Sequence, residues 1–462
     1  MKLRLSSLVV GVDGLGYMGL ATGLAFAAKG WSVIGFDINP EVRTAVAQAR
    51  SPYSEAGLAE LLRSQTSVGR FRLVDSVEEL ARASDVVFMC LPTPSKPSGR
   101  IDLKPIRTGC DQLGLALRSV PRRRLIVVKS TVVPGTTERV VGPIIWRASR
   151  KGSDKVAIAS NPEFLAEGTM VQDALQPDRA VIGTSGGWSR RLLTRLYAPF
   201  HVPVLALTPS GAELVKYSSN TFLAMKVTFA NEISRLAEQL DVNVDDVMGA
   251  VGEDARIGRR FLRAGPGFGG SCFDKDIRAL VTYAADRGLP FRLGRATLRA
   301  NADRIDHIRD LVRSVAPSLN GKRIAVLGLA FKPGTDDVRE SRAFPLIEML
   351  LEEGAAVQAH DPAAVPRFRR EWARLHPRKE GRRPRFSTDV LGTLARADLA
   401  ILHTDWPEYR RWSRAWTSRM TAPIVIDLRR GLSCQAPGLA GVRVISLGVG
   451  GSPPTGLVER ST

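Results

Sequence analysis

The stretch SLVVGVDGLGYMGLATGLAFAAKG, residues 7–30, decides the fold of the first part of the chain. Its apolar start is typical of a buried strand, and Gly14, Gly16 and Gly19 form a G-x-G-x-x-G turn before a helical pattern. The first glycine permits the tight turn, the second lets a pyrophosphate approach the backbone, and the third lets helix pack on strand. The helix N-terminus would face the phosphates. The stretch therefore predicts a strand, a dinucleotide-binding turn and a helix.

A carboxylate ends the second predicted strand. WSVIGFD, residues 31–37, places Asp37 18 residues past Gly19. A carboxylate at this point accepts hydrogen bonds from both ribose hydroxyls and repels a 2′-phosphate. We therefore expect NAD as the cofactor, and not NADP. Asp13, directly before Gly14, is unusual, because its charge would be unfavourable near the pyrophosphate unless it points away.

Short apolar runs alternate with helical patterns up to about residue 207, which predicts a parallel α/β sheet. The runs are LVVGV, WSVIGFD, DVVFMCLP, RLIVVKS, KVAIASN and AVIGTS. From Thr208 the pattern changes to one long helix, for which Thr208 can be the N-cap and Pro209 the first residue. Further helices are expected to about residue 316.

A second α/β pattern begins at GKRIAVLGLAFK, residues 321–332, and continues through AAVQAHDP, ADLAILHTD and APIVIDLRR. The final residues, 448–462, are expected to be flexible. We predict two Rossmann-like parallel-sheet domains joined by a helical central domain. The expected boundaries are 1–207 for the NAD-binding domain, 208–316 for the central helical domain with a dimer interface, and 317–462 for a substrate-binding domain.

Composition limits the class of protein. The chain has 462 residues, of which 44% are hydrophobic and 24% charged, as expected for a folded soluble protein of two or three domains. No apolar run reaches the roughly 18 residues of a membrane span, and the short apolar run at the start does not read as a signal sequence, so we expect a cytoplasmic protein. The four cysteines and five histidines do not cluster, which predicts no metal site.

The formal net charge is +20, and the densest basic segment is residues 367–386, with nine Lys or Arg and two Glu. Such a charge attracts phosphate in general. No helix-turn-helix, zinc-finger or aromatic RNA-binding pattern accompanies it, so we expect no nucleic-acid partner. We interpret residues 367–386 as a solvated surface excursion.

GPGFGGSCF, residues 265–273, presents the single thiol of Cys272 after four glycines. A thiol beside a nicotinamide cofactor can add to an aldehyde, and a second hydride transfer converts the adduct to a thioester that water releases as an acid. Lys275 and the start of the following helix would favour the thiolate. From these residues alone, a small cysteine buried in a turn is an equal alternative.

At this point the chain resembles the UDP-glucose/GDP-mannose dehydrogenase family over nearly its whole length. The matching segments are GLGYMGL, STVVPGTT (130–137), NPEFLAEGTM (161–170), ELVKYSSNTFLAMKVTFANE (213–232), RIGRRFLRAGPGFGGSCF (256–273), GFGGSCFDKD and GLAFKPGTDDVRES (328–341). The resemblance implies oxidation of the C6 alcohol of UDP-glucose to the carboxylate of UDP-glucuronate, with two NAD+ reduced. It also implies a homodimer or higher homo-oligomer.

The same resemblance implies roles for individual residues. Cys272 is the expected nucleophile and Glu163 the expected base for thioester hydrolysis. Lys216 and Asn220, four apart on one helix face, are expected to stabilise the oxyanion. Asp276 and Thr131 are expected to hold the water that assists the first proton removal. Without the resemblance, Lys216 and Asn220 would read as a solvated helix face.

Contacts to the two ligands are implied in the same way. For the cofactor they are Gly14, Gly16, Tyr17, Met18, Gly19, Asp37, Arg43, Thr93, Thr131, Glu167, Lys275 and Arg342. For the substrate they are Phe164, Leu165, Ala166, Glu167, Lys216, Asn220, Arg256, Phe268, Gly269, Phe331, Lys332 and Arg429. Of these, Arg256 is expected to act across a dimer interface.

Some positions depart from the family pattern. Asp274 stands where relatives often carry proline, and Arg263 stands where some relatives have lysine. Arg43 lies one position further after Asp37 than the basic residue expected to contact the cofactor phosphate. None of these changes removes an expected catalytic group.

Two alternatives stay open on the sequence. A GDP-mannose 6-dehydrogenase would use the same chemistry on another base and hexose. A two-electron 3-hydroxyacid dehydrogenase would share the first domain and the helical middle, but it would need neither Cys272 nor a third domain.

Overall fold

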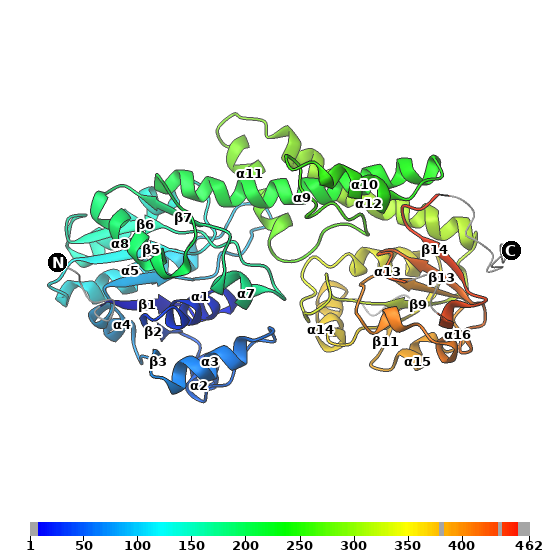
Figure 1. The fold of residues 1–462 in the computed structure, drawn as a ribbon, viewed down its shortest axis with the longest axis horizontal. Coiled ribbons are helices and arrows are strands. Elements are labelled where there is room, and N and C mark those ends of the chain that lie inside the picture. The colour runs from blue at the N-terminus through cyan, green and yellow to red at the C-terminus, as the bar shows by residue number, and fades with distance from the viewer. Residues whose placement is uncertain (1–7, 378–382, 433–436, 451–462) are drawn as a thin grey trace. The chain divides into compact units, whose positions relative to one another are not determined.

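The computed structural model describes residues 8–377, 383–432 and 437–450. The chain forms two compact units: residues 1–219 with 282–289, and residues 220–281 with 290–462. Each unit contains one sheet with helices, and the helix α9 (Pro209–Gln239) belongs partly to both (Figure 1). The predicted fold class, two parallel-sheet domains with a helical middle, is confirmed.

The first sheet has eight strands in the order β3-β2-β1-β4-β5-β6-β7-β8. Their bounds are β1 Val9–Asp13, β2 Ser32–Phe36, β3 Phe71–Leu73, β4 Val86–Met89, β5 Arg124–Val128, β6 Val156–Ser160, β7 Ala180–Thr184 and β8 Val204–Leu207. The prediction missed β3 and β8, because both are short edge strands that are only partly buried.

One pair in this sheet is antiparallel, against the expectation of a wholly parallel sheet: β7 runs opposite to β6. A parallel return needs a crossover of a dozen or more residues, usually a helix that packs back across the sheet. The connection from β6 to β7, residues 161–179, is long enough for such a crossover, but its helix α7 (Met170–Leu175) has only six residues, and the chain enters β7 in the opposite direction.

The helices of the first unit cover both faces of the sheet. Val10 and Val12 face one apolar cluster, and Val87 and Met89 face another. Burial on both faces explains why the central strands read as continuous apolar runs. The helices are α1 Tyr17–Ala28, α2 Pro40–Ala47, α3 Leu58–Ser67, α4 Val77–Ala83, α5 Lys104–Ala116, α6 Gly142–Ser149, α7, and α8 Gly187–Tyr197, with short turns η2 Leu117–Ser119, η3 Thr137–Val141 and η4 Ala198–Phe200.

The helical middle is also confirmed. It consists of α9, α10 Val244–Glu253, α11 Phe273–Ala285 and α12 Arg292–Val315. Pro209 is the first residue of α9, and the Thr208 hydroxyl accepts the Gly211 amide at 3.1 Å, which is the predicted N-cap.

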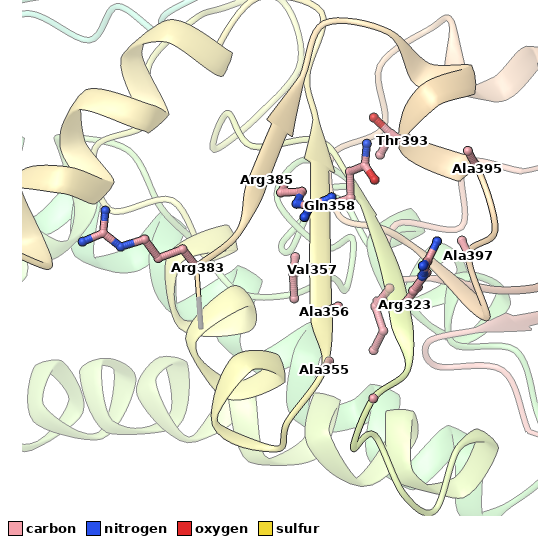
Figure 2. A pocket seen from close by; sticks show the side chains of 12 residues that line it. Arg323, Ala355, Ala356, Val357, Gln358, Arg383, Arg385, Thr393, Ala395 and Ala397 are labelled. Carbon is pink, nitrogen blue, oxygen red and sulfur yellow. The ribbon is translucent and has the colours of Figure 1, made fainter. Parts of the chain in front are cut away.

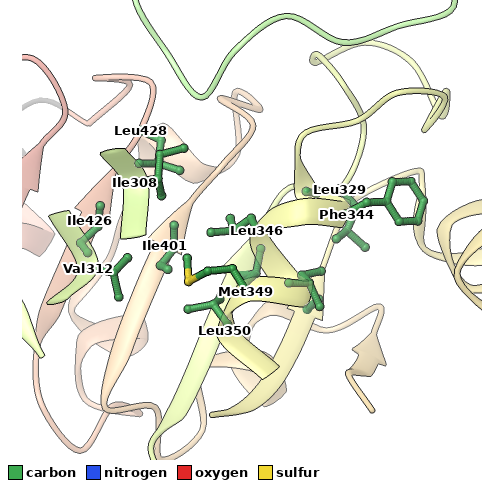
Figure 3. Packing of buried hydrophobic residues seen from close by; sticks show 14 of the residues in the cluster. Ile308, Val312, Leu329, Phe344, Leu346, Met349, Leu350, Ile401, Ile426 and Leu428 are labelled. Atoms are coloured by element: carbon green, nitrogen blue, oxygen red, sulfur yellow. The ribbon is translucent and has the colours of Figure 1, made fainter. Parts of the chain in front are cut away.

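The second sheet has six parallel strands in the order β11-β10-β9-β12-β13-β14. Figure 3 shows apolar side chains of α12 and α13 packed with residues of β12 and β13. The strands are β9 Arg323–Leu327, β10 Ala356–His360, β11 Arg385–Ser387, β12 Leu399–Leu402, β13 Ile424–Asp427 and β14 Arg443–Ser446. The helices are α13 Ala343–Glu352, α14 Val365–Leu375, α15 Val390–Leu394 and α16 Arg414–Thr417, with turns η5 Tyr409–Arg411 and η6 Pro437–Leu439.

The basic segment 367–386 is not simply a surface excursion. Its first nine residues, 367–375, belong to α14, the crossover helix between β10 and β11. Phe368 of this helix is fully buried and stacks on Phe344 with ring centroids 4.0 Å apart. Its arginines lie on the opposite, polar face of an amphipathic helix. Residues 378–382 lie outside the described part of the chain.

The expectation of a flexible end concerns residues 448–462, of which only 448–450 are described. These three are held: Gly448 accepts the Val244 amide at 2.8 Å, and Gly450 donates to the Val242 carbonyl at 3.2 Å.

Asp13 ends β1 inside the core of the first unit. It is 6% exposed, its Oδ2 has no hydrogen-bond partner among the described residues, and burial and then the charge of Asp37 raise its pKa from 3.8 to about 7. A carboxyl group whose pKa is raised in the folded state binds its proton more tightly there than in the unfolded chain. The cost of ionising Asp13 is therefore absent below its unfolded pKa, grows with pH, and is fully present above about pH 7.

We predict that Asp13→Asn, which keeps the volume and removes the charge, raises the unfolding temperature more at pH 8 than at pH 5. The full gain at pH 8 is on the order of 4 kcal/mol. Thermal unfolding at both pH values measures it, with the exposed Asp75→Asn as the control. Glu213, whose pKa burial also raises to about 7, is present in all three proteins. An equal gain at both pH values would contradict the prediction.

Candidate active site

In the glycine turn after β1, there is a different structural reason for glycine at each of the three positions. Gly14 has a φ of +92°, and a Cβ there would lie 2.7 Å from the Cys90 carbonyl. A Cβ on Gly19 would collide with the Gly14 carbonyl, because α1 passes close to the turn. Gly16 has open space around its Cβ position. The open position at the start of α1 is where a pyrophosphate could approach the backbone.

Asp37 follows β2 beside this turn. Its Oδ2 accepts the Leu15 amide at 2.7 Å, and its Oδ1 accepts the Asn39 amide at 2.8 Å. The side chain is only half-buried, so both oxygens keep lone pairs for ribose hydroxyls. Arg43 donates to the Asp37 carbonyl at 2.6 Å, which holds this guanidinium at the same corner. The residues present therefore fit an adenosine ribose and a pyrophosphate.

The second sheet repeats this turn without the binding feature. Gly328, after β9, has a φ of +99°, and Asp361, after β10, accepts the amides of Leu329 and Ala330. Asp361 also accepts two further amides and the indole N–H of Trp406, and it is 2% exposed. A carboxylate so fully occupied leaves no acceptor for a ribose, which distinguishes the two sheets chemically.

Strand order brings further predicted residues to the carboxyl edge of the first sheet. Strands β1, β4, β5 and β6 are neighbours, and the loops that follow them carry Gly14, Thr93, Thr131 and Glu163. In open α/β sheets this edge is where ligands bind. Of the other predicted cofactor residues, Tyr17, Met18 and Glu167 belong to the first unit, and Lys275 and Arg342 belong to the second.

Glu163 and Lys216 form a buried ion pair in the first unit. Lys216 Nζ lies 2.9 Å from Glu163 Oε1, and the two side chains are 5% and 6% exposed. Glu163 Oε2 accepts the Leu165 amide at 2.7 Å, so the loop itself orients the carboxylate. Because both charges are removed from water, each is stable in its charged form only while the other compensates it. Lys216 is therefore not on a solvated helix face.

The substrate residues expected beside Glu163 lie in the same loop. Two cations lie near the ring of Phe164: Lys216 Nζ is 5.6 Å and the Arg179 guanidinium is 4.5 Å from the ring centroid. Leu165 is half-buried, and Ala166 is exposed. Arg179, which the sequence reading missed, adds a second cation at this aromatic ring.

Two more groups beneath this loop were not foreseen. Asn161 accepts from Lys129 Nζ at 3.0 Å and from the Tyr197 hydroxyl at 2.6 Å, and it donates to the Val181 carbonyl. Glu213 accepts the amides of Gly135 and Thr137 and the Thr137 hydroxyl. Both sets fix the loops after β5 and β6. Their partners are far apart in the sequence, so no local pattern could reveal them.

Cys272 lies in the second unit, directly before α11, and it is exposed. One turn into the helix, Asp276 is 1% exposed, and its amide donates to the Cys272 carbonyl at 3.0 Å. Asn220 Nδ2 donates to Asp276 Oδ2 at 2.6 Å. Lys275 Nζ lies 2.5 Å from Asp276 Oδ1, so its charge is offset by that carboxylate. The unusual Asp274 pairs with Arg278 one turn later.

The glycine loop before Cys272 packs tightly against its own unit. A Cβ on Gly267 would lie 2.7 Å from Asn301 Oδ1, and one on Gly269 would collide with the Glu340 carbonyl. A Cβ on Gly270 would lie 2.8 Å from the Phe331 ring. These glycines therefore let the loop backbone pack directly against the segment that follows β9. This close packing is a second reason for glycine, in addition to leaving space for a ligand.

The predicted nucleotide-binding residues of the second sheet gather around this loop, at the carboxyl ends of the strands. Arg429 donates to the His403 carbonyl at 3.0 Å, and its guanidinium lies against Gly265. Burial lowers the pKa of Arg429 to about 10, so it stays charged at neutral pH. Lys332 Nζ lies 5.4 Å from the centroid of the Phe331 ring.

Two arginines complete the predicted set. Arg342 lies beside Gly267, and its Nε has no hydrogen-bond partner among the described residues. Arg256, in contrast, has a side chain 89% exposed and pairs with Asp254. Arg263, one of the departures from the family pattern, donates to Asp405 at 3.1 Å and to the Arg429 carbonyl at 2.6 Å.

A separate hollow of about 440 Å³ lies at the other end of the second sheet (Figure 2). Its lining includes Arg323, Ala356 and Arg385, which begin β9, β10 and β11. The candidate residues lie at the carboxyl ends of these strands, so the hollow is not part of the site. Among residues 8–377, 383–432 and 437–450, no acidic, Cys or His cluster could hold a metal, and no helix is both long and apolar enough to cross a membrane.

Known proteins resemble the chain along almost its whole length. Three domain models of the UDP-glucose/GDP-mannose dehydrogenase family match: the NAD binding domain at residues 8–201, the central domain at 210–303 and the UDP binding domain at 325–433. UDP-glucose 6-dehydrogenase AglM of Haloferax volcanii is 39% identical over 91% of this chain and 96% of its own. UDP-glucose 6-dehydrogenase TuaD of Bacillus subtilis is 36% identical over 95% of this chain and 93% of its own.

A solved UDP-glucose dehydrogenase from the hyperthermophilic archaeon Pyrobaculum islandicum has a TM-score of 0.87 and 36% identity, and the match covers 98% of this chain and all of that one. The expected cofactor is confirmed by the NAD binding domain. Because all three domains match in order along one chain, the protein belongs to the UDP-glucose/GDP-mannose dehydrogenase family and is an NAD-dependent nucleotide-sugar dehydrogenase.

Proposed function

We propose that the protein oxidises UDP-glucose to UDP-glucuronate in two successive oxidations at C6, with Cys272 holding the intermediate. The observation that carries this proposal is an exposed thiol one helical turn from the buried Asn220–Asp276 pair. The UDP binding domain and the named relatives support UDP-glucose as the substrate. NAD+ held by Gly14, Gly16, Gly19 and Asp37 would accept one hydride in each oxidation.

The residues of the chain divide the remaining work. Asp276 and Thr131 hold the water that takes the proton of the C6 alcohol, and the resulting aldehyde is attacked by the Cys272 thiolate to give a thiohemiacetal. Lys216 and Asn220 stabilise the charge that develops on the C6 oxygen. After the second oxidation, Glu163 takes a proton from the water that attacks the thioester. Carboxylate and free thiol are the products.

The contacts of Glu163 and Lys216 suit these roles. A carboxylate paired with an ammonium at 2.9 Å and oriented by the Leu165 amide is held in one direction. Asn220 has a matching arrangement, because its amide group is fixed by Asp276. Preorganised groups of this kind need no rearrangement when charge develops.

We also propose that the working form is a homodimer joined through α9. Phe222, Phe229 and Leu236 are 60%, 52% and 57% exposed, and they repeat every seven residues along the helix. A stripe of large apolar side chains at this spacing is typical of a helix that packs on another helix. The exposed Arg256 then has a role in completing the site of the partner copy.

The stoichiometry of the reaction tests the chemistry. We predict two NADH for each UDP-glucose consumed, measured by absorbance and by chromatography of the sugar nucleotides. Cys272→Ser loses the second oxidation, because a serine hydroxyl is a far weaker nucleophile at neutral pH. GDP-mannose is the parallel substrate, and the same ratio on GDP-mannose alone would move the protein to that branch. One NADH per turnover in the wild type would contradict the thioester mechanism.

Glu163→Gln separates hydrolysis from oxidation. We predict a rapid first release of two NADH per subunit, followed by a steady rate lower by about 10²-fold or more, because the thioester lacks its general base. Intact-protein mass spectrometry should find the acyl group on Cys272. The control is Glu138→Gln, an exposed carboxylate of the same unit. Absence of the acyl group together with a slow first release would contradict this role.

Light scattering after size exclusion tests the assembly. We predict a dimer or larger assembly of the wild type and a monomer for Phe229→Glu, because a charge in the apolar stripe must be desolvated to pair. Leu115→Glu, at a 50% exposed position on α5, controls for the added charge. A wild-type monomer, or a Phe229→Glu protein that still assembles, would refute the proposed interface.

A further inference from the structure

Residues 265–271, the glycine loop before Cys272, are fixed at Phe268 by one side chain. Asn301, on α12 and 7% exposed, accepts the Phe268 amide at 2.8 Å through Oδ1 and donates to the Phe268 carbonyl at 3.1 Å through Nδ2. One amide group thus satisfies both backbone groups of a residue, as a neighbouring strand would. The peptide planes on each side of Phe268 are fixed by this pair of bonds.

A second anchor holds Gly265, at the start of the loop. Its amide donates to Asn231 Oδ1 at 2.7 Å, and its carbonyl accepts from Arg304 Nε at 2.9 Å. Arg304 also donates to the Asn231 carbonyl and to the Ser234 hydroxyl. Side chains from α9 and α12 therefore take both backbone groups of Gly265, and Arg304 ties the two helices together.

The buried charge of Arg304 is compensated within the same unit. Arg304 is 4% exposed, and burial lowers its pKa to about 10. Its guanidinium can only donate, so His307 Nδ1 must accept from it, at 2.6 Å. His307 Nε2 then carries the hydrogen and donates to Glu238 at 2.6 Å. The chain from Arg304 through His307 to a carboxylate explains how a cation is maintained behind the loop.

The side chain of Phe268 links these anchors to the thiol. Its ring packs with Ala224 and Ile277, and it lies edge-on to Phe273 with centroids 5.9 Å apart. Phe273 and Ile277 belong to the first turns of α11, which begins immediately after Cys272. The backbone of Phe268 is thus fixed to α12, and its ring is fixed to the helix that presents the thiol.

We propose that Asn301, with Asn231 and Arg304, is a positioning residue for Cys272. The anchors at Gly265 and Phe268 set where the glycine loop ends and α11 begins, and hence where the Cys272 sulfur stands relative to Asn220 and Asp276. The proposal rests on the proposed function only in taking Cys272 as the nucleophile. A scaffold that merely stabilised the fold would affect unfolding and leave the chemistry per folded molecule unchanged.

The test compares Asn301→Ala and Asn231→Ala with Thr297→Ala. Thr297 is a matched control: it is 4% exposed on the same helix as Asn301, and within the described part of the chain its hydroxyl bonds only the Leu293 carbonyl of that helix. We expect kcat to fall by about 10²-fold in both asparagine variants, because small misplacement of a reacting group has such an effect. KM for UDP-glucose should rise by a smaller factor than kcat falls, because the same loop carries the expected substrate contacts Phe268 and Gly269. Thr297→Ala should keep the wild-type kcat and KM.

Hydrogen exchange of the peptide that contains Phe268 is measured on the same samples, because it reports the anchor without any substrate. Faster exchange in Asn301→Ala with a wild-type kcat would overturn the proposal, and Asn231→Ala gives the same decision should Asn301→Ala fold poorly. Equal losses of kcat in Thr297→Ala would also overturn it. If Cys272→Ser keeps two NADH per UDP-glucose, the proposed function fails by itself, whereas a lost second NADH with unaffected asparagine variants refutes the positioning role alone.

Discussion

The structure depends on pairing buried carboxylates with side chains of a single helix. Glu163 and Asp276 are 6% and 1% exposed, and α9 supplies Lys216 to the first and Asn220 to the second. Removing Lys216 would leave the buried Glu163 carboxylate without its counter-charge, which costs about 3–5 kcal/mol, whereas removing Asn220 would take one hydrogen bond from Asp276. Lys216 and Asn220 are four residues apart, about one helical turn. The helix α9 therefore supplies a partner for one buried carboxylate in each unit.

The two sheets show how one chain can use the same turn for different purposes. Both turns need a glycine with positive φ, Gly14 and Gly328, and both place an aspartate at the end of the next strand. In the first sheet that aspartate keeps free acceptor capacity at a half-buried position. In the second it is consumed by four backbone amides and an indole. Asp361 is a structural brace for the turn, whereas Asp37 can recognise a ligand.

The sequence predicts best where the relevant physics is local. The glycine turn, the N-cap at Thr208 and the central strands each follow from a few neighbouring residues, and the structure agrees with them. The edge strands β3 and β11 were not predicted, because each has only three residues, one of which is an exposed arginine, and so neither forms an apolar run. In α14 the arginines outnumber the buried Phe368 and Trp372, so the composition of the segment favours a surface, and only the four-residue spacing of these two side chains indicates a buried face.

The supports of the candidate site could not be predicted for a different reason. Asn301 lies 33 residues from Phe268, and Arg304 lies 39 residues from Gly265. On a helix, an asparagine or an arginine reads as an ordinary polar position, and only the fold shows that both are buried. The proposed catalytic residues lie in motifs that resemble a known family, whereas these supports carry no local motif at all.

The glycine loop joins these two kinds of information. Its glycine-rich sequence is typical of a flexible loop, yet its backbone is hydrogen-bonded at Gly265, Phe268 and Gly270. At its glycines, neighbouring atoms also occupy the space that a Cβ would need. Glycine there serves close packing, since the missing Cβ atoms of Gly267, Gly269 and Gly270 let the backbone approach Asn301, the Glu340 carbonyl and the Phe331 ring. A thiol that must meet a reacting carbon within a few tenths of an ångström requires such a support, because rigidity at the nucleophile has to come from the residues that hold its backbone.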